Sequence, residues 1–222
     1  MQYIIKRSKR RTIALEINSS GQIIVRSPFR ISDSFIDQLV QKKKQWILNK
    51  IKLINKRILK KVIKRFEEGE CFLFLGKKYK LRINQKQKEK IVLNTEICSK
   101  EKEKLKIKEN ILNWYKKEAL IYFSKRIKFL ASKYDFKYNN IAISNAKKRL
   151  GVCNQYNDIR INWRLILSPI EVIDYVIIHE LVHTKIKNHS RIYWNSVNLI
   201  LPNYKKMEKW LKENREEVFF ND

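Results

Sequence analysis

Residues 179–183 read His-Glu-Leu-Val-His, and this spacing constrains the fold of the chain more than any other feature of its sequence. On an α-helix, positions i and i+4 lie on one face, so His179 and His183 project together and can share one metal ion. Glu180 lies about 100° farther round such a helix, where it can accept a proton from a metal-activated water molecule without being a ligand. The motif therefore predicts a helix that carries part of a metal-dependent hydrolytic site.

A catalytic zinc site needs a third protein ligand, and His189 is the nearest candidate. The chain has three histidines, and all of them fall within residues 179–189. A continuous helix would point His189 away from the other two, so the helix must end first, and Asn188 tolerates the left-handed conformation that ends helices. Acidic residues downstream remain alternatives for the third ligand: Glu208, Glu213, Glu216 and Glu217. We predict one Zn²⁺ per chain, held by the three histidines, with Glu180 as the general base.

Hydropathy patterns on both sides of the motif predict an α+β fold. Strands are expected within residues 1–26, 71–83 (a hairpin), 140–144 and 158–163, and helices at 32–66, 99–133 and from Ser168, as the cap, through the metal motif. The predicted architecture is N-terminal strands and long helices that lead to a small antiparallel sheet packed on a zincin-like metal-binding helix. We expect residues 1–98 to form a basic strand-helix-hairpin region and residues 99–222 the metallohydrolase region, unless the two make one continuous domain.

The net charge of +28 is distributed unevenly along the chain. Residues 1–150 hold 40 basic and 13 acidic residues, whereas residues 151–222 hold 10 and 9. A uniform drift of codon usage towards lysine would not readily leave the last third neutral, so a nucleic acid or another polyanion is a candidate partner of residues 1–150. Lysine-rich helix faces are also common as plain solvated surfaces, and that alternative stays open.

The cysteines and the apolar runs exclude several classes of protein. Three cysteines without a CxxC spacing make neither a disulfide framework nor a structural zinc site. The longest apolar runs are far too short to span a bilayer, and the N-terminus has no apolar run of signal-peptide length. We therefore expect a cytoplasmic protein with no membrane partner.

Several stretches of the chain resemble a known family. They are residues 161–166, Ser168-Pro169, residues 173–176, the His-Glu-Leu-Val-His motif, residues 188–190 and Tyr193-Trp194, with weaker similarity at residues 75–82, at Trp114-Tyr115 and in the basic N-terminal hairpin. Together they are similar to the YgjP-like branch of the SprT-like zinc metallopeptidases, over nearly the whole chain and most specifically over residues 140–211. The resemblance implies a compact α+β metallopeptidase-like fold, with His179, His183 and His189 as zinc ligands and Glu180 as the catalytic base.

One segment departs from the family pattern. The family often shows Arg-x-Gly-Ser-Cys, usually with Trp before the Gly, whereas this chain has Arg149, Leu150, Gly151, Val152 and Cys153. The two changed positions put in doubt how this segment shapes the cleft. Peptide hydrolysis also needs a donor for the oxyanion, and the sequence does not rank the candidates: Tyr193, Tyr204, Arg149 and Arg164. The strand at residues 160–163 is a candidate edge for an extended peptide substrate, or an ordinary inner strand.

Three functions are compatible with these features. The first is a zinc metallopeptidase that cleaves peptide bonds with Glu180 as general base. The second keeps the zinc chemistry but acts on nucleotides or other phosphate esters, which suits a basic chain. The third is a nucleic-acid-associated protein with a structural zinc, and it is disfavoured because structural zinc usually has four protein ligands with cysteine prominent.

Overall fold

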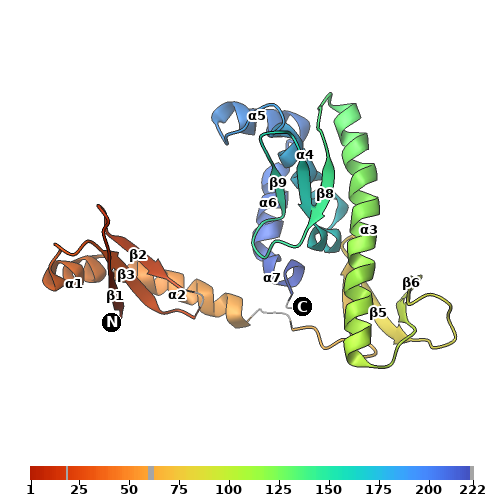
Figure 1. The fold of residues 1–222 in the computed structure, drawn as a ribbon, viewed down its shortest axis with the longest axis horizontal. Helices are drawn as coiled ribbons and strands as arrows, with labels where there is room; N and C mark the ends of the chain where they lie inside the picture. The colour runs from red at the N-terminus through yellow and green to blue at the C-terminus, as the bar shows by residue number, and fades with distance from the viewer. Residues whose placement is uncertain (19, 60–62, 221–222) are drawn as a thin grey trace. The chain divides into compact units, whose positions relative to one another are not determined.

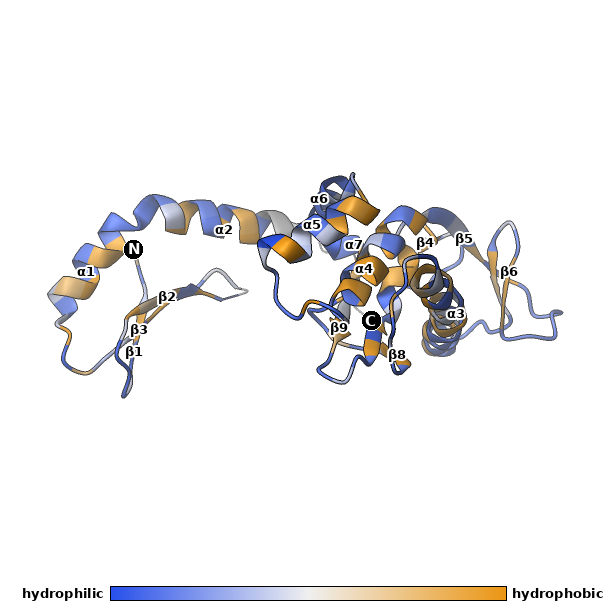
Figure 2. Cartoon of the chain, turned by 90° about the horizontal axis from the view of Figure 1, so that it is seen from above, coloured by the Kyte–Doolittle hydropathy of each residue, from blue (hydrophilic) through white to orange (hydrophobic). Residues whose placement is uncertain are grey.

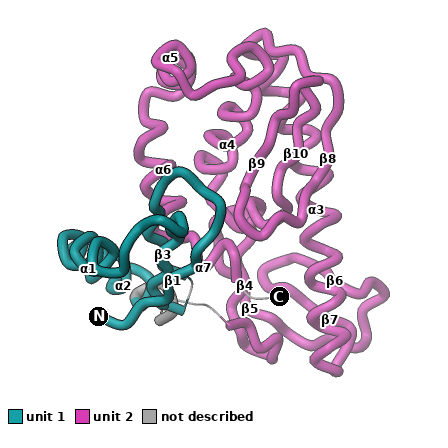
Figure 3. The backbone as a smooth tube through the Cα atoms, turned by 60° about the vertical axis from the view of Figure 1, so that its left-hand side comes forward, with its two compact units in different colours: residues 1–61 teal, residues 62–222 magenta. Residues whose placement is uncertain are grey.

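The computed structural model describes residues 1–18, 20–59 and 63–220, and the chain divides into two compact units (Figures 1 and 3). Unit 1 comprises Met1–Lys61 and unit 2 comprises Val62–Asp222. Each unit has its own hydrophobic core. The boundary expected between residues 98 and 99 falls inside unit 2, whose core contains side chains from both sides of it, among them Leu81 and Ile107.

Unit 1 is a three-stranded sheet with two helices. Its elements are β1 (Ile4–Arg7), β2 (Ala14–Ile17), β3 (Ile23–Ser27), α1 (Asp33–Lys42) and α2 (Lys44–Leu59). The strand order is β1-β3-β2, with β1 parallel and β2 antiparallel to β3. Val25 and Ile36 are fully buried between the sheet and α1. The single helix expected over residues 32–66 is divided in two at Lys43, whose φ of −95° and ψ of 7° end α1.

The first half of unit 2 is a four-stranded sheet followed by one long helix. Its elements are β4 (Cys71–Phe74), β5 (Lys77–Ile83), β6 (Ile91–Leu93), β7 (Ile97–Ser99) and α3 (Lys104–Lys133), with strand order β4-β5-β7-β6. The expected hairpin is confirmed, with Leu75 and Gly76 as its turn. Both turn residues have positive φ, and a Cβ on Gly76 would lie 2.8 Å from the Cα of Pro169. The turn therefore needs glycine because the start of the metal-motif helix lies against it.

The second half of unit 2 carries the metal motif. Its elements are β8 (Ile141–Ser144), β9 (Gly151–Cys153), β10 (Ile159–Asn162), a short 3-10 helix η1 (Trp163–Leu167), α4 (Ile170–Val182), α5 (Arg191–Ile200), α6 (Tyr204–Glu213) and α7 (Arg215–Val218). Pro169, not Ser168, is the N-cap residue of α4, and the Ser168 hydroxyl is buried without a partner among the described residues. The capping prediction was thus wrong, and α4 begins one residue later.

The α+β class is confirmed, but the small sheet beside α4 is mixed and not antiparallel. Its order is β8-β10-β9, with β10 antiparallel to β9 and parallel to β8. The chain crosses from β8 to the far side of β10 before it enters β9, and the hairpin from β9 to β10 then makes β10 run with β8. The Asn162 amide fixes that crossing by donating to the carbonyl oxygens of Ala146 and Arg149, at 2.5 and 2.9 Å.

The α4 helix lies in the core of unit 2, where it contacts α3, α5, α6, β9 and β10. Its side chains are buried on nearly all sides, and Figure 2 draws α4 largely in the hydrophobic colour. A helix that is apolar all round is held by its surroundings and has little freedom to move. In the part of the chain that the structure describes, no helix is both long and apolar enough to cross a membrane.

Candidate metal centre

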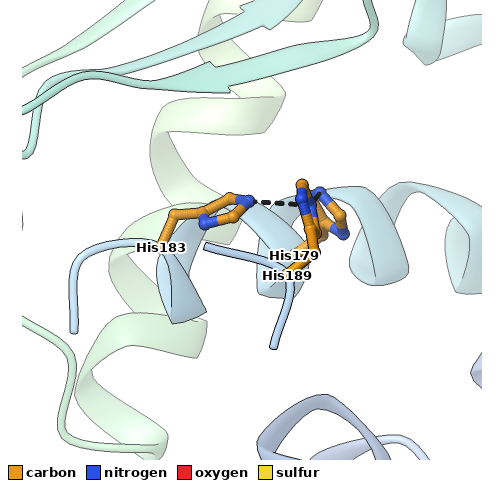
Figure 4. Close-up of side chains that lie close together, drawn as sticks. All are labelled: His179, His183 and His189. Atoms are coloured by element: carbon orange, nitrogen blue, oxygen red, sulfur yellow. Dashed lines mark hydrogen bonds between the residues drawn. The ribbon is translucent and has the colours of Figure 1, made fainter. Parts of the chain in front are cut away.

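Three histidines from the end of α4 and the segment after it converge on one point (Figure 4). The Nε2 atom of His189 lies 3.1 Å from Nε2 of His183 and 3.2 Å from Nε2 of His179. Two nitrogens that each bind one tetrahedral zinc at about 2.0–2.1 Å lie about 3.3 Å apart. His189 therefore lies at the distance from each of the other two that a shared zinc ion requires, and the ligand atoms of all three lie within 4.8 Å of one another.

Tight turns, and not a residue in the left-handed conformation, end α4 early enough for the chain to return His189 to the side of His179 and His183. Thr184 N donates to Leu181 O and Lys185 N to Val182 O, each at 3.0 Å, which are the i to i−3 bonds of a closing turn. Asn188 does not use the left-handed conformation that asparagine tolerates, since the described non-glycine residues with positive φ are Phe66, Leu75, Asp135 and Asn157. The prediction that the helix stops before His189 is confirmed.

Lys187 ties the segment that carries His189 to the turn between β9 and β10. Its ammonium donates to Asn154 O at 2.9 Å and to Asn157 Oδ1 at 2.6 Å. The bonded turn belongs to the sheet that packs on α4, so the segment after α4 has a fixed support. The motif spacing gave no signal for this lysine.

The surroundings of the histidines orient their rings. Nδ1 of His183 lies 3.0 Å from Ile186 O, so a proton on Nδ1 is hydrogen-bonded and the Nε2 lone pair is free for a metal. The ring of Tyr193 stacks on that of His183, with centroids 4.5 Å apart, and its hydroxyl donates to His179 O at 2.9 Å. Trp194 stacks on His189 at 5.6 Å. Aromatic residues of α5 thus hold all three rings in place.

Burial favours the neutral form of two of the histidines, His179 and His183. It lowers the pKa of His179 to about 3, with smaller contributions from His183 and His189, and it also lowers the pKa of His183. A neutral imidazole is the form that binds a metal. Nδ1 of His179 is buried and has no hydrogen-bond partner among the described residues.

Glu180 is buried beside the cluster, with 5% of its surface exposed. Burial raises the pKa of its carboxyl group to about 8, and a hydrogen bond from the backbone N–H of Cys153 opposes that rise. A nearby divalent cation would favour the charged carboxylate. A Cβ on Gly151 would lie 2.7 Å from Glu180 Cγ and would collide with its Oε1. The Gly and Cys that the family motif shares with this chain therefore both contact the acid.

The strand β9 is an edge strand, and its free edge lies at Glu180. Asn162 N donates to Leu150 O and Asn154 N to Asp158 O, so the bonding groups of Leu150, Val152 and Asn154 face β10. The N–H and C=O groups of Gly151 and Cys153 point away from β10, and on that side the Cys153 N–H donates to the Glu180 carboxyl group. β10, at residues 159–162, is the central strand, so the proposal of a peptide-binding edge at residues 160–163 was wrong.

The structure brings one of the four oxyanion candidates into contact with the histidines. That residue, Tyr193, is fully buried and its hydroxyl is bonded to a helix carbonyl. The ring of Tyr204 stacks on that of Trp194, with centroids 5.4 Å apart, so Trp194 lies between Tyr204 and His189. Arg164 is buried, donates to Asn145 Oδ1 at 2.7 Å and lies over the Trp163 ring. Arg149 is exposed and lines a cavity on the sheet.

Comparison with known families agrees with this geometry. The family model for the YgjP-like metallopeptidase domain matches residues 11–214. The chain belongs to the YgjP-like family. The matched residues include parts of both units and the whole histidine cluster. No curated protein and no solved structure matches the chain. The family and the three convergent histidines together indicate a metal-dependent peptidase.

Proposed function

We propose that this YgjP-like chain is a zinc-dependent peptidase whose catalytic base is Glu180 and whose metal ligands are His179, His183 and His189. The observation that carries the proposal is the convergence of three Nε2 atoms next to a buried carboxylate. Among the described residues the cluster holds three metal-binding side chains and no fourth. A catalytic zinc has three protein ligands and an open position, whereas a structural zinc has four.

The side chains around the cluster have separate tasks in hydrolysis. Zinc, when bound, supplies Lewis acidity to a water molecule and to the carbonyl group of the substrate. Glu180 takes a proton from the water and passes it to the amine that leaves. The Cys153 N–H and the absent side chain of Gly151 fix where the Glu180 carboxylate lies.

An extended peptide can pair with β9. The free N–H and C=O groups of Gly151 face the outer edge of this strand, beside Glu180. Main-chain pairing binds a peptide irrespective of its side chains and holds it in an extended conformation beside Glu180. The family assignment favours this substrate over a nucleotide or another phosphate ester.

The test is a substrate screen of the zinc-loaded protein beside two variants. We expect about one zinc per chain, cleavage of unfolded protein, and no turnover of nucleoside triphosphates. Glu180→Gln should keep the zinc and lose cleavage. Glu171→Gln is the matched control, because Glu171 is exposed on the first turn of the same helix. Cleavage of nucleoside triphosphates alone, or full peptidase activity in Glu180→Gln, would contradict the proposal.

A further inference from the structure

A basic cavity lies on the small sheet that carries β9. Its volume is about 510 Å³, and four cationic side chains line it together with Ser144, Ala146 and Val152: Lys147, Lys148, Arg149 and Arg160. No acidic residue lines it among the described residues. The four cations are exposed, and in the described ranges none of them forms an ion pair with a carboxylate. Such a concentration of unpaired positive charge attracts an anionic group.

The cavity lies on the face of the sheet opposite to α4. Side chains alternate along a strand, and the Gly151 position points at Glu180 on α4, so Val152 points to the other face. Val152 is paired with Arg160, which therefore shares that face. Ile159 and Ile161, the neighbours of Arg160 on β10, are fully buried on the α4 side.

A peptide paired with β9 would place its side chains on these two faces in turn. Residues opposite Gly151 would face α4 and the metal cluster, whereas the residue opposite Val152 would point to the cavity face. Arg149 lies two residues before the start of β9, and Arg160 lies on the neighbouring strand β10, about 4.8 Å from β9.

We infer that the cavity lined by Lys147, Arg149 and Arg160 selects substrates with an acidic side chain at the position paired with Val152. This inference rests on the proposed peptidase function and names the substrate class of that same site. It predicts a preference with a period of two residues, because only every second substrate side chain faces the cavity. A general attraction to the +28 net charge of the chain would favour acids at all positions alike.

The test uses one peptide that the zinc-loaded protein cleaves. Glutamate is placed at each position around the cleaved bond in turn, with glutamine at the same position as the neutral reference. We expect the ratio of kcat/KM for the Glu and Gln peptides to be about twofold to fivefold at alternate positions and near one between them, as exposed ion pairs allow. The preference should weaken as salt is raised.

Two variants and one control locate the effect. Arg160→Gln should bring the ratio towards one, and Arg160→Glu should turn the preference towards lysine-containing peptides. Lys128→Gln, which removes an exposed cation on α3, should leave the ratio as in the unmodified protein. A ratio near one everywhere, equal ratios at all positions, or ratios that Arg160→Glu does not change would overturn the inference while peptidase activity stands. A protein that cleaves no peptide refutes the proposed function itself and the inference with it.

Discussion

Gly151→Ala is the sharpest test of how the acid is held. The added Cβ would lie 2.7 Å from Cγ and 2.8 Å from Cδ of Glu180, about 0.8 Å short of ordinary carbon–carbon contact. Either β9 or the carboxylate must move by about that amount. Overpacking of this kind costs about 1–3 kcal/mol of folding free energy. Displacing a catalytic group by about 1 Å lowers turnover by about 100-fold.

We therefore expect Gly151→Ala to lose about 10- to 100-fold in kcat/KM while it keeps one zinc per chain. Activity is measured on a cleaved peptide, zinc by metal analysis, and stability by urea unfolding. Gly69→Ala is the control, because its φ of +82° strains an alanine although nothing lies within 4 Å of the new Cβ. The control should lose stability and keep activity. Full activity in Gly151→Ala would show that β9 does not position Glu180.

Four further predictions follow from the supports of the site and from the two units. Lys187→Met should weaken zinc binding about tenfold in a chelator competition, whereas Lys185→Met in the same segment should not, because Lys187 alone of the two bonds Asn154 and Asn157. In the metal-free protein, Glu180 keeps its proton up to about pH 8 when folded but only to about 4.5 when unfolded, so the free energy of unfolding should fall as pH rises through that window. The loss should reach up to about 4 kcal/mol at pH 8 in urea unfolding, and it should be absent in Glu180→Gln. If the unfolding free energies of Glu180→Gln and the unmodified protein change with pH in parallel, the raised pKa of Glu180 is refuted. Residues 63–222 alone should fold and bind zinc, because the core of unit 2 is separate from that of unit 1; a fragment that stays unfolded by circular dichroism would contradict this. Residues 1–61, with 16 basic and 3 acidic residues, should bind DNA in a salt-dependent manner, and absence of binding at low salt would exclude that role.

The metal cluster was predictable from the sequence because its geometry is local. Two of its residues are one helical turn apart, and His189 follows six residues later, so no long-range pairing had to be known. The long helix that ends at residue 133 and the hairpin at residues 71–83 also followed from periodicity and turn residues.

The supports of the site depend on pairings between distant segments, and the sequence did not predict them. Whether β8 pairs with β10 or with β9 depends on which side of β10 receives β9, and no local pattern encodes that choice. The contact of Gly151 with Glu180 joins residues of a strand and a helix that meet only in the folded unit. Lys187 gave no signal, because a lysine that bonds a turn has the same sequence pattern as one that faces water.

The turn between β4 and β5 has a consequence for the order in which the protein assembles. Leu75 N donates to Ile166 O and Gly76 N to Leu167 O, so the turn holds the residues just before α4 although they lie about 90 residues apart in sequence. A ribosome releases the hairpin long before it releases α4. Until the segment before α4 leaves the ribosome, the amide groups of Leu75 and Gly76 have no protein acceptor and are hydrated by water. The three histidines follow this segment in the chain, so the nascent chain acquires its metal site among the final steps of folding.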